Sequence, residues 1–400
     1  MSTILFNGQF LLISATNLCL FLVVATWSFL PVVIVEMGGN SIDVGLVIGS
    51  IGVTSLGSLP LLAPLIDRYG RKTFIVGGIL LMGITNAGFL LFKVYSPLMI
   101  IVRVIQGIAF AACFNGCATA VVDLIPPEHR AQGIGFFGVS GSLAVAIGPY
   151  IGEVFLTRWG NTAYFLLLVG FGLLGFLMAL MVKESNRNID REQLQGFFPT
   201  AFHDGHLPMM IMAAIFGSGF AAMNTFIPLF AKNLGLKAGL FFISYGCSLI
   251  IVRMALGQLA DRINRDKLIF ACLIGFGVML VSTSRMDSMI QMVFLGGLFG
   301  VLQGLSYPAM MARMVDRADD NNLGVVVALF TGSFGVGLNI SVLGWGVIAD
   351  ANGISSMFLI GGLIMFACAA VAAWPLVAGK ETSLPRPIVV ESKSDERPLR

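Results

Sequence analysis

The chain contains twelve apolar runs, and each is close to the length that a helix needs to cross a lipid bilayer, which is about 20 residues. Hydrophobic residues make up 57% of the chain and charged residues 11%, whereas soluble domains carry about 25% charged residues. A chain so poor in charge has lipid as its solvent. We therefore predict twelve transmembrane helices, at Phe10–Val35, Ile42–Pro64, Thr73–Phe92, Leu98–Val122, Gly133–Leu156, Thr162–Val182, Leu207–Ala231, Gly239–Leu259, Leu268–Ser284, Met289–Ala312, Leu323–Ile348 and Ser355–Val377.

One long charged connection, Lys183 to His206, divides these runs into six and six. We therefore expect an N-terminal six-helix bundle over residues 1–182, a linker over 183–206 and a C-terminal six-helix bundle over 207–378. The remaining residues, 379–400, contain prolines and alternating charges. Such composition is typical of disordered segments, so we expect a disordered tail.

A short charged block interrupts the apolar pattern at the same place in each half. It is an acid followed by clustered cations, and it comes after the second and the eighth run. The copies lie 194 residues apart (Asp67 to Asp261), close to half of the 400 residues. Such internal repetition is typical of secondary transporters. It predicts an all-α membrane protein of two pseudo-symmetric bundles, with block residues Asp67, Arg68, Gly70, Arg71 and Lys72 in the first copy and Asp261, Arg262 and Arg265 in the second.

Lys and Arg are divided unevenly between the two ends of the predicted bundles. The end with both charged blocks, the linker and the tail holds most of them, and the opposite end holds Lys93, Arg158, Lys232, Lys237 and Arg285. Cytoplasmic loops carry the excess of cations in membrane proteins. We therefore expect a multi-pass protein of the inner (plasma) membrane with both termini in the cytoplasm.

Three charged residues fall deep inside predicted spans, namely Arg103, Arg253 and Glu153, whereas Asp43 stands at the edge of the second span beside the first external turn. A cation at such depth costs at least about 2.5 kcal/mol, so each arginine should face a cavity or a partner. Snorkelling of Arg103 toward the interface is the alternative. Arg103 and Glu153 both lie in the outer half, so an ion pair between them is one hypothesis.

Neutral polar side chains inside spans need partners in hydrocarbon, so they should face the bundle interior. Some could simply join helix to helix, and others could line a substrate cavity. Cys113 and Cys117, four residues apart, could hold a metal or form a redox pair, but packing is favoured because no His or acid accompanies them. We expect no metal or cofactor, and the cavity candidates are Asn17, Gln106, Asn224, Arg253, Gln303 and Asn339.

The charged blocks resemble those of the major facilitator superfamily, in its drug/proton-antiporter-like branch, similar to sugar-efflux permeases. The resemblance covers nearly the whole chain. It implies that Asp67 faces the amino end of the eleventh helix while the cations bind acids at neighbouring helix ends, which gives a latch between conformations. A helix amino terminus favours such a carboxylate. The segment from Asp123 to Arg130 resembles the end of the family's fourth helix, with Asp123 as the acidic partner.

Two further stretches carry the resemblance. The segment Arg103 to Gly107 resembles the fourth-helix signature, whose arginine is implicated in proton coupling, and Gly148, Pro149 and Gly152 resemble the antiporter signature, which bends and packs the fifth helix. The sequence departs from the family where Ala63, Asn264 and Glu153 replace glycines and where Gly300 stands opposite Arg103. The first span also lacks the acid that several drug/proton antiporters keep.

These observations favour a secondary transporter that works by alternating access, most simply proton-coupled efflux of a drug-like or sugar-like compound. Uptake or facilitated diffusion by the same fold is the alternative, followed by a non-transporting receptor. An enzyme is disfavoured because the spans hold no nucleophile–base pair or metal cluster. The expected partners are the lipid bilayer, a small-molecule substrate and protons; a net charge of +3 is too small to indicate nucleic acid, and we expect a monomer.

Overall fold

In the computed structural model the chain is described over residues 8–125, 130–184, 206–255, 264–316 and 323–377. These residues form helices and short turns, with no strand among them. The first half holds α2 (Gly8–Thr26), η1 (Trp27–Phe29), α3 (Leu30–Glu36), α4 (Ser41–Tyr69), α5 (Arg71–Gly88), η2 (Phe89–Leu91), α6 (Leu98–Leu124) and α7 (Arg130–Leu180). The second half holds α9 (Leu207–Asn233), α10 (Gly239–Ala255), α12 (Arg265–Thr283), α13 (Met289–Val315), α14 (Leu323–Asn352) and α15 (Ile354–Val377).

Helix α7 comprises two membrane spans joined by a sharp turn. Its 51 residues would extend about 77 Å, more than twice the hydrocarbon thickness of about 30 Å. Gly160 breaks the helical backbone at φ 75° and ψ −173°, a conformation that glycine tolerates because it lacks Cβ. The ten long apolar helices, with α7 counted twice and the shorter Gly239–Val252 added, confirm the twelve predicted spans.

The first span is divided into α2, η1 and α3. Pro31 has no N–H to donate and stands in the first turn of α3, directly after the 3₁₀ turn Trp27–Phe29. This break leaves Trp27 buried, at 5% exposure. Trp27 is thereby placed on the inner side of the first half, where it borders a cavity.

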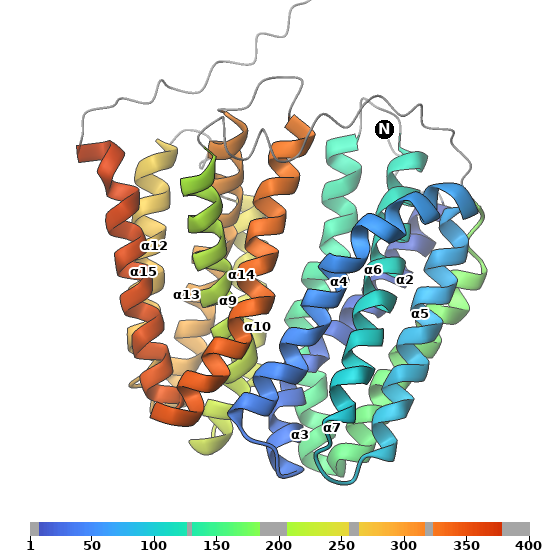
Figure 1. Cartoon of the computed structure of the whole chain (residues 1–400), viewed down its shortest axis with the longest axis horizontal. Helices are drawn as coiled ribbons and strands as arrows, with labels where there is room; N and C mark the ends of the chain where they lie inside the picture. The colour runs from blue at the N-terminus through green and yellow to red at the C-terminus, as the bar shows by residue number, and fades with distance from the viewer. Residues whose placement is uncertain (1–7, 126–129, 185–205, 256–263, 317–322, 378–400) are drawn as a thin grey trace, which may run out of the picture.

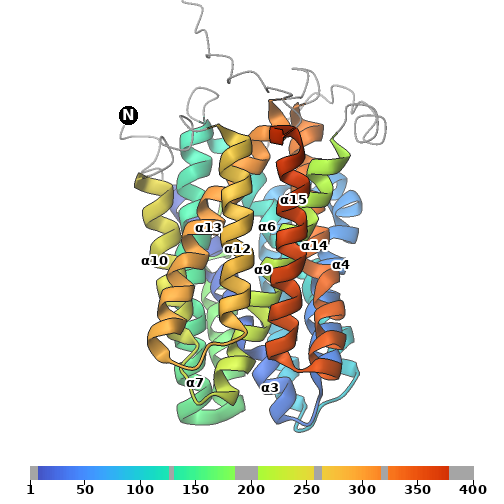
Figure 2. The same ribbon diagram turned by 90° about the vertical axis from the view of Figure 1, so that its left-hand side faces the viewer.

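Helices α2–α7 gather in one half of the molecule and α9–α15 in the other (Figure 1). Between the halves, α4 packs against α14 and α7 packs against α10. The described chain begins and finishes at the same end of the helices (Figures 1 and 2). We call this end, which holds Arg71, Asp123 and Glu184, the linker end, and the opposite end, with the turns at Gly38 and Gly235, the distal end.

The first charged block is not a loop, as the predicted spans imply, but the meeting point of two helices. Helix α4 continues to Tyr69 and α5 begins at Arg71, so Gly70 alone connects them. Its φ of 91° is in the region that favours glycine. Asp67 in the last turn of α4 and Arg71 at the start of α5 therefore lie on either side of this junction, close enough for an ion pair.

Candidate transport site

A cavity of about 380 Å³ lies between the two halves, within the range of about 300–1,000 Å³ that is typical of small-molecule sites. Helices α2, α4, α6 and α7 with η1 and α3 form its wall on one side, and α9 and α14 on the other. Most lining side chains are apolar or aromatic. The polar ones are Ser28, Ser55, Arg103, Asn224, Thr225 and Asn339.

Arg103 is 1% exposed and still borders this cavity. Its guanidinium carbon lies 4.1 Å from the centre of the Trp27 ring. Its Nε donates to Val47 O at 3.2 Å and its Nη1 to Gln106 Oε1 at 2.8 Å. Hydrogen bonds to a charged group contribute about 1.5–3 kcal/mol each, and a desolvated cation–π contact about 2 kcal/mol. These contacts offset part of the cost of burying the ion, which is several kcal/mol.

A buried amide network fixes the position of Arg103. Gln106 Nε2 and Trp27 Nε1 both donate to Asn86 Oδ1, at 3.1 and 3.2 Å. Asn86 in turn donates to Met82 O of its own helix at 2.8 Å. The network joins the first, third and fourth spans and holds Arg103 at the border of the cavity.

The predicted ion pair between Arg103 and Glu153 is wrong. Glu153 Oε2 accepts the backbone N–H of Gly239 at 2.9 Å, the first residue of α10 in the other half. A carboxylate is favoured there because the N–H groups at a helix amino terminus carry partial positive charge. Glu153 is 8% exposed and therefore joins the two halves at the distal end, away from Arg103.

The two halves are closely packed at the distal end. A Cβ built on Gly45 of α4 would lie 2.9 Å from the Leu343 backbone of α14, and one built on Gly246 of α10 would overlap Ala146 of α7. A further ion pair, Lys232 Nζ to Glu36 Oε1 at 2.6 Å, crosses the halves at the surface. Glycines therefore permit backbone contact that any side chain would prevent.

Toward the linker end, the described parts of the α4–α14 and α7–α10 pairs no longer bury these faces. On α4, the face that carries Gly45 and Gly52 is buried, but Pro60 and Ala63 farther along that face are exposed. On α14, Thr331 is exposed one turn beyond the Gly335 contact with Leu56. On α7, Leu143 and Val139 are exposed one and two turns beyond Ala146. The cavity is thus closed by protein at the distal end.

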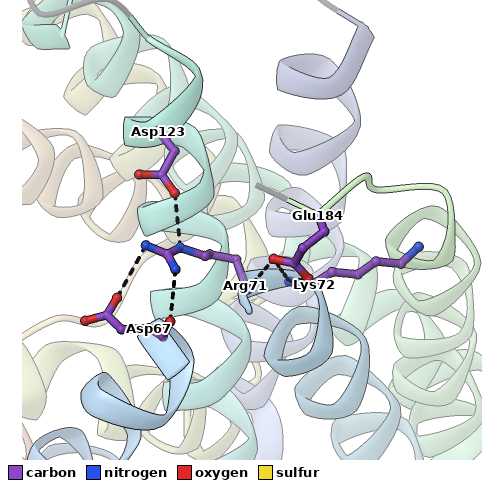
Figure 3. A network of polar contacts seen from close by, with 5 residues as sticks. All are labelled: Asp67, Arg71, Lys72, Asp123 and Glu184. Carbon is purple, nitrogen blue, oxygen red and sulfur yellow. Dashed lines mark hydrogen bonds and ion pairs between the residues drawn. The ribbon is translucent and has the colours of Figure 1, made fainter. Parts of the chain in front are cut away.

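Residues of the first charged block form a cluster of polar contacts at the linker end (Figure 3), in which the side chains of Arg71 and Asp123 are buried and Asp67 and Glu184 are exposed. Arg71 Nε lies 3.0 Å from Asp123 Oδ2 at the end of α6, and Arg71 Nη2 lies 3.4 Å from Asp67 Oδ1. Glu184, just beyond α7, accepts the backbone N–H of Arg71 at 2.7 Å and that of Lys72 at 3.2 Å. Asp67 pairs within its own half here, whereas the resemblance implies a contact with the eleventh helix.

The other block residues are less connected. The Arg68 guanidinium lies over the Tyr69 ring, 5.3 Å from its centre. In the second copy, Arg265 pairs with Asp316, and Arg313 Nε lies 2.5 Å from Asp266 Oδ1. Asp261 and Arg262 and the side chain of Arg130 lie outside the described part of the chain.

The predicted cavity residues divide into two groups. Asn224 and Asn339 line the cavity. Asn17, Gln106 and Gln303 do not: Asn17 donates to Ser140 Oγ at 2.8 Å and joins α2 to α7, Gln106 supports Arg103, and Gln303 is buried in α13. Proximity to the middle of a span does not say which face a side chain occupies. The side chain of Arg253 lies outside the described part.

The glycines of the two family-like stretches mark close helix contacts. A Cβ on Gly107 would lie 2.5 Å from Ile51 O of α4, and one on Gly152 would lie 2.7 Å from the Thr26 side chain. Thr26 Oγ1 donates to Gly148 O at 3.1 Å, which is a carbonyl one residue before Pro149, a cavity residue. Cys113 and Cys117 are fully buried in the core. Among the described residues, no group of three or more potential metal ligands occurs.

Sequence reasoning missed Trp27, Asn86 and Glu184. Trp27 and Asn86 stand in apolar runs where a lone aromatic or amide residue is common, and they lie 59 residues apart in the sequence. Glu184 is one of several charges in the predicted linker. Its place directly after the sixth span was the available signal, because a helix end next to the block residues can supply a cap.

The fold and the cavity between its halves define a solute transporter embedded in a membrane. The sequence profile of the Major Facilitator Superfamily matches residues 12–266 and 237–395, and the chain belongs to this family. It is therefore a transporter and not an enzyme.

Similar proteins support this assignment. An uncharacterized MFS-type transporter of Methanocaldococcus jannaschii is 25% identical over 80% of this chain and 86% of that protein. The staphylopine export protein of Staphylococcus aureus is 21% identical over 84% of this chain and 88% of that protein. The multi-drug resistance efflux pump PmrA of Streptococcus pneumoniae is 23% identical over 72% of this chain and 77% of that protein. Among solved structures, the nucleoside transporter NupG superposes with a TM-score of 0.71 at 14% identity, covering 91% of this chain and 99% of that one. A bacterial homologue of the human lysosomal transporter Spinster, in an inward-facing and unoccupied conformation, also gives 0.71 at 14%, over 95% and 96%.

Proposed function

We propose that the chain is a proton-coupled exporter of small drug-like or sugar-like solutes that works by alternating access in the inner (plasma) membrane. Two bundles, residues 1–182 and 207–378, rock about the central cavity. The linker 183–206, the tail 379–400 and both termini lie in the cytoplasm. The excess of cations at the linker end supports this orientation.

The observation that carries the proposal is a central cavity walled by both halves, whose described residues close it at the distal end and leave it open toward the linker end. With the linker end in the cytoplasm, this arrangement is the inward-facing state. A solute would enter from the cytoplasm and leave after the distal seams part. The names of the staphylopine exporter and the PmrA efflux pump support the outward direction.

Glu153 is our candidate for the proton carrier. Its carboxylate holds the amino terminus of α10 across the two halves. Glu153 would take up a proton from the outside while the distal contacts are parted, because its carboxylate then lacks the α10 terminus. It would release that proton toward the cytoplasm when the contacts close and the terminus again favours the negative charge. Arg103 carries a fixed positive charge on the cavity wall. We assign it to proton coupling, in which binding of solute beside this charge is linked to the protonation of Glu153.

The first charged block would act as the latch of the opposite state. When the linker end closes, Asp67, which is 48% exposed here, is free to face the amino end of α14. Arg71 stays anchored to Asp123 and Glu184. The second copy, with Asp261, Arg262 and Arg265, would act as the corresponding latch within the C-terminal half.

The test is solute-dependent proton movement in proteoliposomes loaded with a pH-sensitive dye. A panel of sugars, amphiphilic anions and amphiphilic cations is added under an imposed proton gradient. Export predicts that at least one solute moves against its gradient while protons move the other way. Solute movement that needs no protons would favour uptake or facilitated diffusion instead, and no movement of any solute would favour a receptor.

A further inference from the structure

The wall of the central cavity carries a positive charge without a matching negative one. Arg103 is the only charged side chain among the described residues that line it. Glu153, the acid that the sequence suggested as the partner of Arg103, is held instead by the backbone N–H of Gly239. The remaining polar lining residues, such as Ser55 and Asn224, are neutral.

Among the described residues, the Arg103 guanidinium has neutral acceptors only. Val47 O and the Gln106 amide accept from Nε and Nη1, and the Trp27 ring lies against the carbon. In the part of the chain that the structure describes, Nη2 has no recorded acceptor. A carboxylate would bind a guanidinium more strongly than these neutral groups do, because both partners of the hydrogen bond are then ionised. The described lining of the cavity therefore contains no acidic group that would balance the charge of Arg103.

The rest of the cavity fits an apolar body. Phe21, Phe110 and Phe220 line it beside Trp27, and aromatic faces accept rings and aliphatic groups alike. On the opposite half, the Asn224 side chain lines the cavity and has no hydrogen-bond partner among the described residues. It can donate to or accept from a neutral polar group of the solute.

We propose that the transported solute is a small amphiphilic organic anion. Its acidic group binds Arg103, and its apolar body lies among the aromatic side chains, while a cation of the same shape is excluded by the arginine. This inference rests on the proposed function, in that the cavity is taken as the transport site. It adds the sign of the charge, which separates this chain from an exporter of cationic compounds.

The experiment compares three probes with one shared body: 1-naphthylacetate, its uncharged amide 1-naphthylacetamide, and the cation 2-(1-naphthyl)ethylamine. Binding to the purified full-length protein in lipid nanodiscs is measured by calorimetry at pH 7 with no gradient. The carboxylate should bind about tenfold more tightly than the amide, as expected for a charge-assisted hydrogen bond, and the amine more weakly than the amide.

Two variants and a control sharpen this ranking. Arg103→Gln should make the carboxylate and the amide bind equally. Gln106→Glu places a carboxylate beside the guanidinium and should shift the preference toward the amine. Arg158→Gln, the same change at an exposed arginine of the distal turn, should leave the ranking as it is.

Three results would overturn the inference: an amine that binds the unmodified protein as tightly as the carboxylate, no saturable carboxylate binding, or an Arg103→Gln variant that loses all three probes equally. Because this binding is measured without a gradient, it is independent of proton coupling and direction. A protein that ranks the probes as expected but exports none would refute the proposed function and leave the anion site supported. Export without this ranking would support the proposed function and refute the anion site.

Discussion

The two charged blocks begin with similar sequences and stabilise the next helix in different ways. In the first half, the amino terminus of α5 is capped by Glu184, which comes from the far end of α7, 113 residues along the chain from Arg71. In the second half, the side chain of Asn264 caps its own helix α12, accepting from Asp266 N at 3.0 Å and Lys267 N at 3.2 Å. Asn264, which stands where the family has a glycine, thus caps the helix that it begins.

The ion pairs of the two blocks also differ, in how far their side chains are exposed. The side chains of Arg71 and Asp123 are 4% and 3% exposed, whereas those of Arg265 and Asp316 are 19% and 37% exposed. The first cluster connects α4, α5, α6 and the start of the linker. The second, as far as the described residues show, connects only α12 and α13.

This difference teaches that repetition of a sequence block does not repeat its mechanical role. Movement of α4 relative to α5 and α6 would break contacts of Arg71 on several sides. The second cluster can move as a unit with α12 and α13. We therefore expect the first half to be the sensitive one, and paired substitutions can break or sharpen this view.

The largest contrast is expected between Asp123→Ala and Asp316→Ala. Removing Asp123 leaves a buried arginine without its main counter-charge, which costs about 3–5 kcal/mol, whereas the exposed pair of Arg265 contributes about 0–1 kcal/mol. The free energy of unfolding in mixed micelles measures both. Equal losses in the two variants would contradict the asymmetry.

A smaller contrast is expected between Gly70→Ala and Asn264→Gly. Alanine at position 70 must adopt φ near 91° with its Cβ 2.6 Å from the Glu184 carboxylate, and such strain costs about 1–3 kcal/mol. Glycine at position 264 replaces a cap at a cost of a few tenths of a kcal/mol. Hydrogen exchange of the first-turn amides of α5 and α12 reports on each cap separately. If the first turn of α12 loosens more than that of α5, the assignment of the two caps is wrong.

The smallest effect on stability is expected for Asp67→Ala. Asp67 is half exposed and pairs with Arg71 across the junction at Gly70, and an ion pair with an exposed partner contributes about 0–1 kcal/mol. Transport should nevertheless fall, because the variant lacks the carboxylate that we propose as the latch of the outward-open state. Cysteines introduced at Ala63 and Thr331 should react faster with an impermeant maleimide in this variant, and unchanged labelling would count against the latch.

The spans could be predicted from sequence because lipid imposes a length and an apolar composition on every crossing helix. The turn at Gly160 and the short α10 did not obscure the pattern. The site was predicted less well, because its contacts join residues that no local pattern relates. Glu153 illustrates the reason: its partner is the backbone N–H of Gly239, which has no sequence signature, so an ion pair with Arg103 was the reasonable and incorrect prediction.

Paired distance measurements by electron spin resonance test the central claim, alternating access controlled by Glu153, most directly. One pair of labels, at Val94 and Ala351, spans the distal end, and another, at Ala63 and Thr331, spans the linker end, with the exposed Cys247 replaced by serine. Acidification, or Glu153→Gln at neutral pH, should lengthen the distal distance and shorten the linker distance together. Distances that stay constant, or that change in the same direction at both ends, would contradict the account.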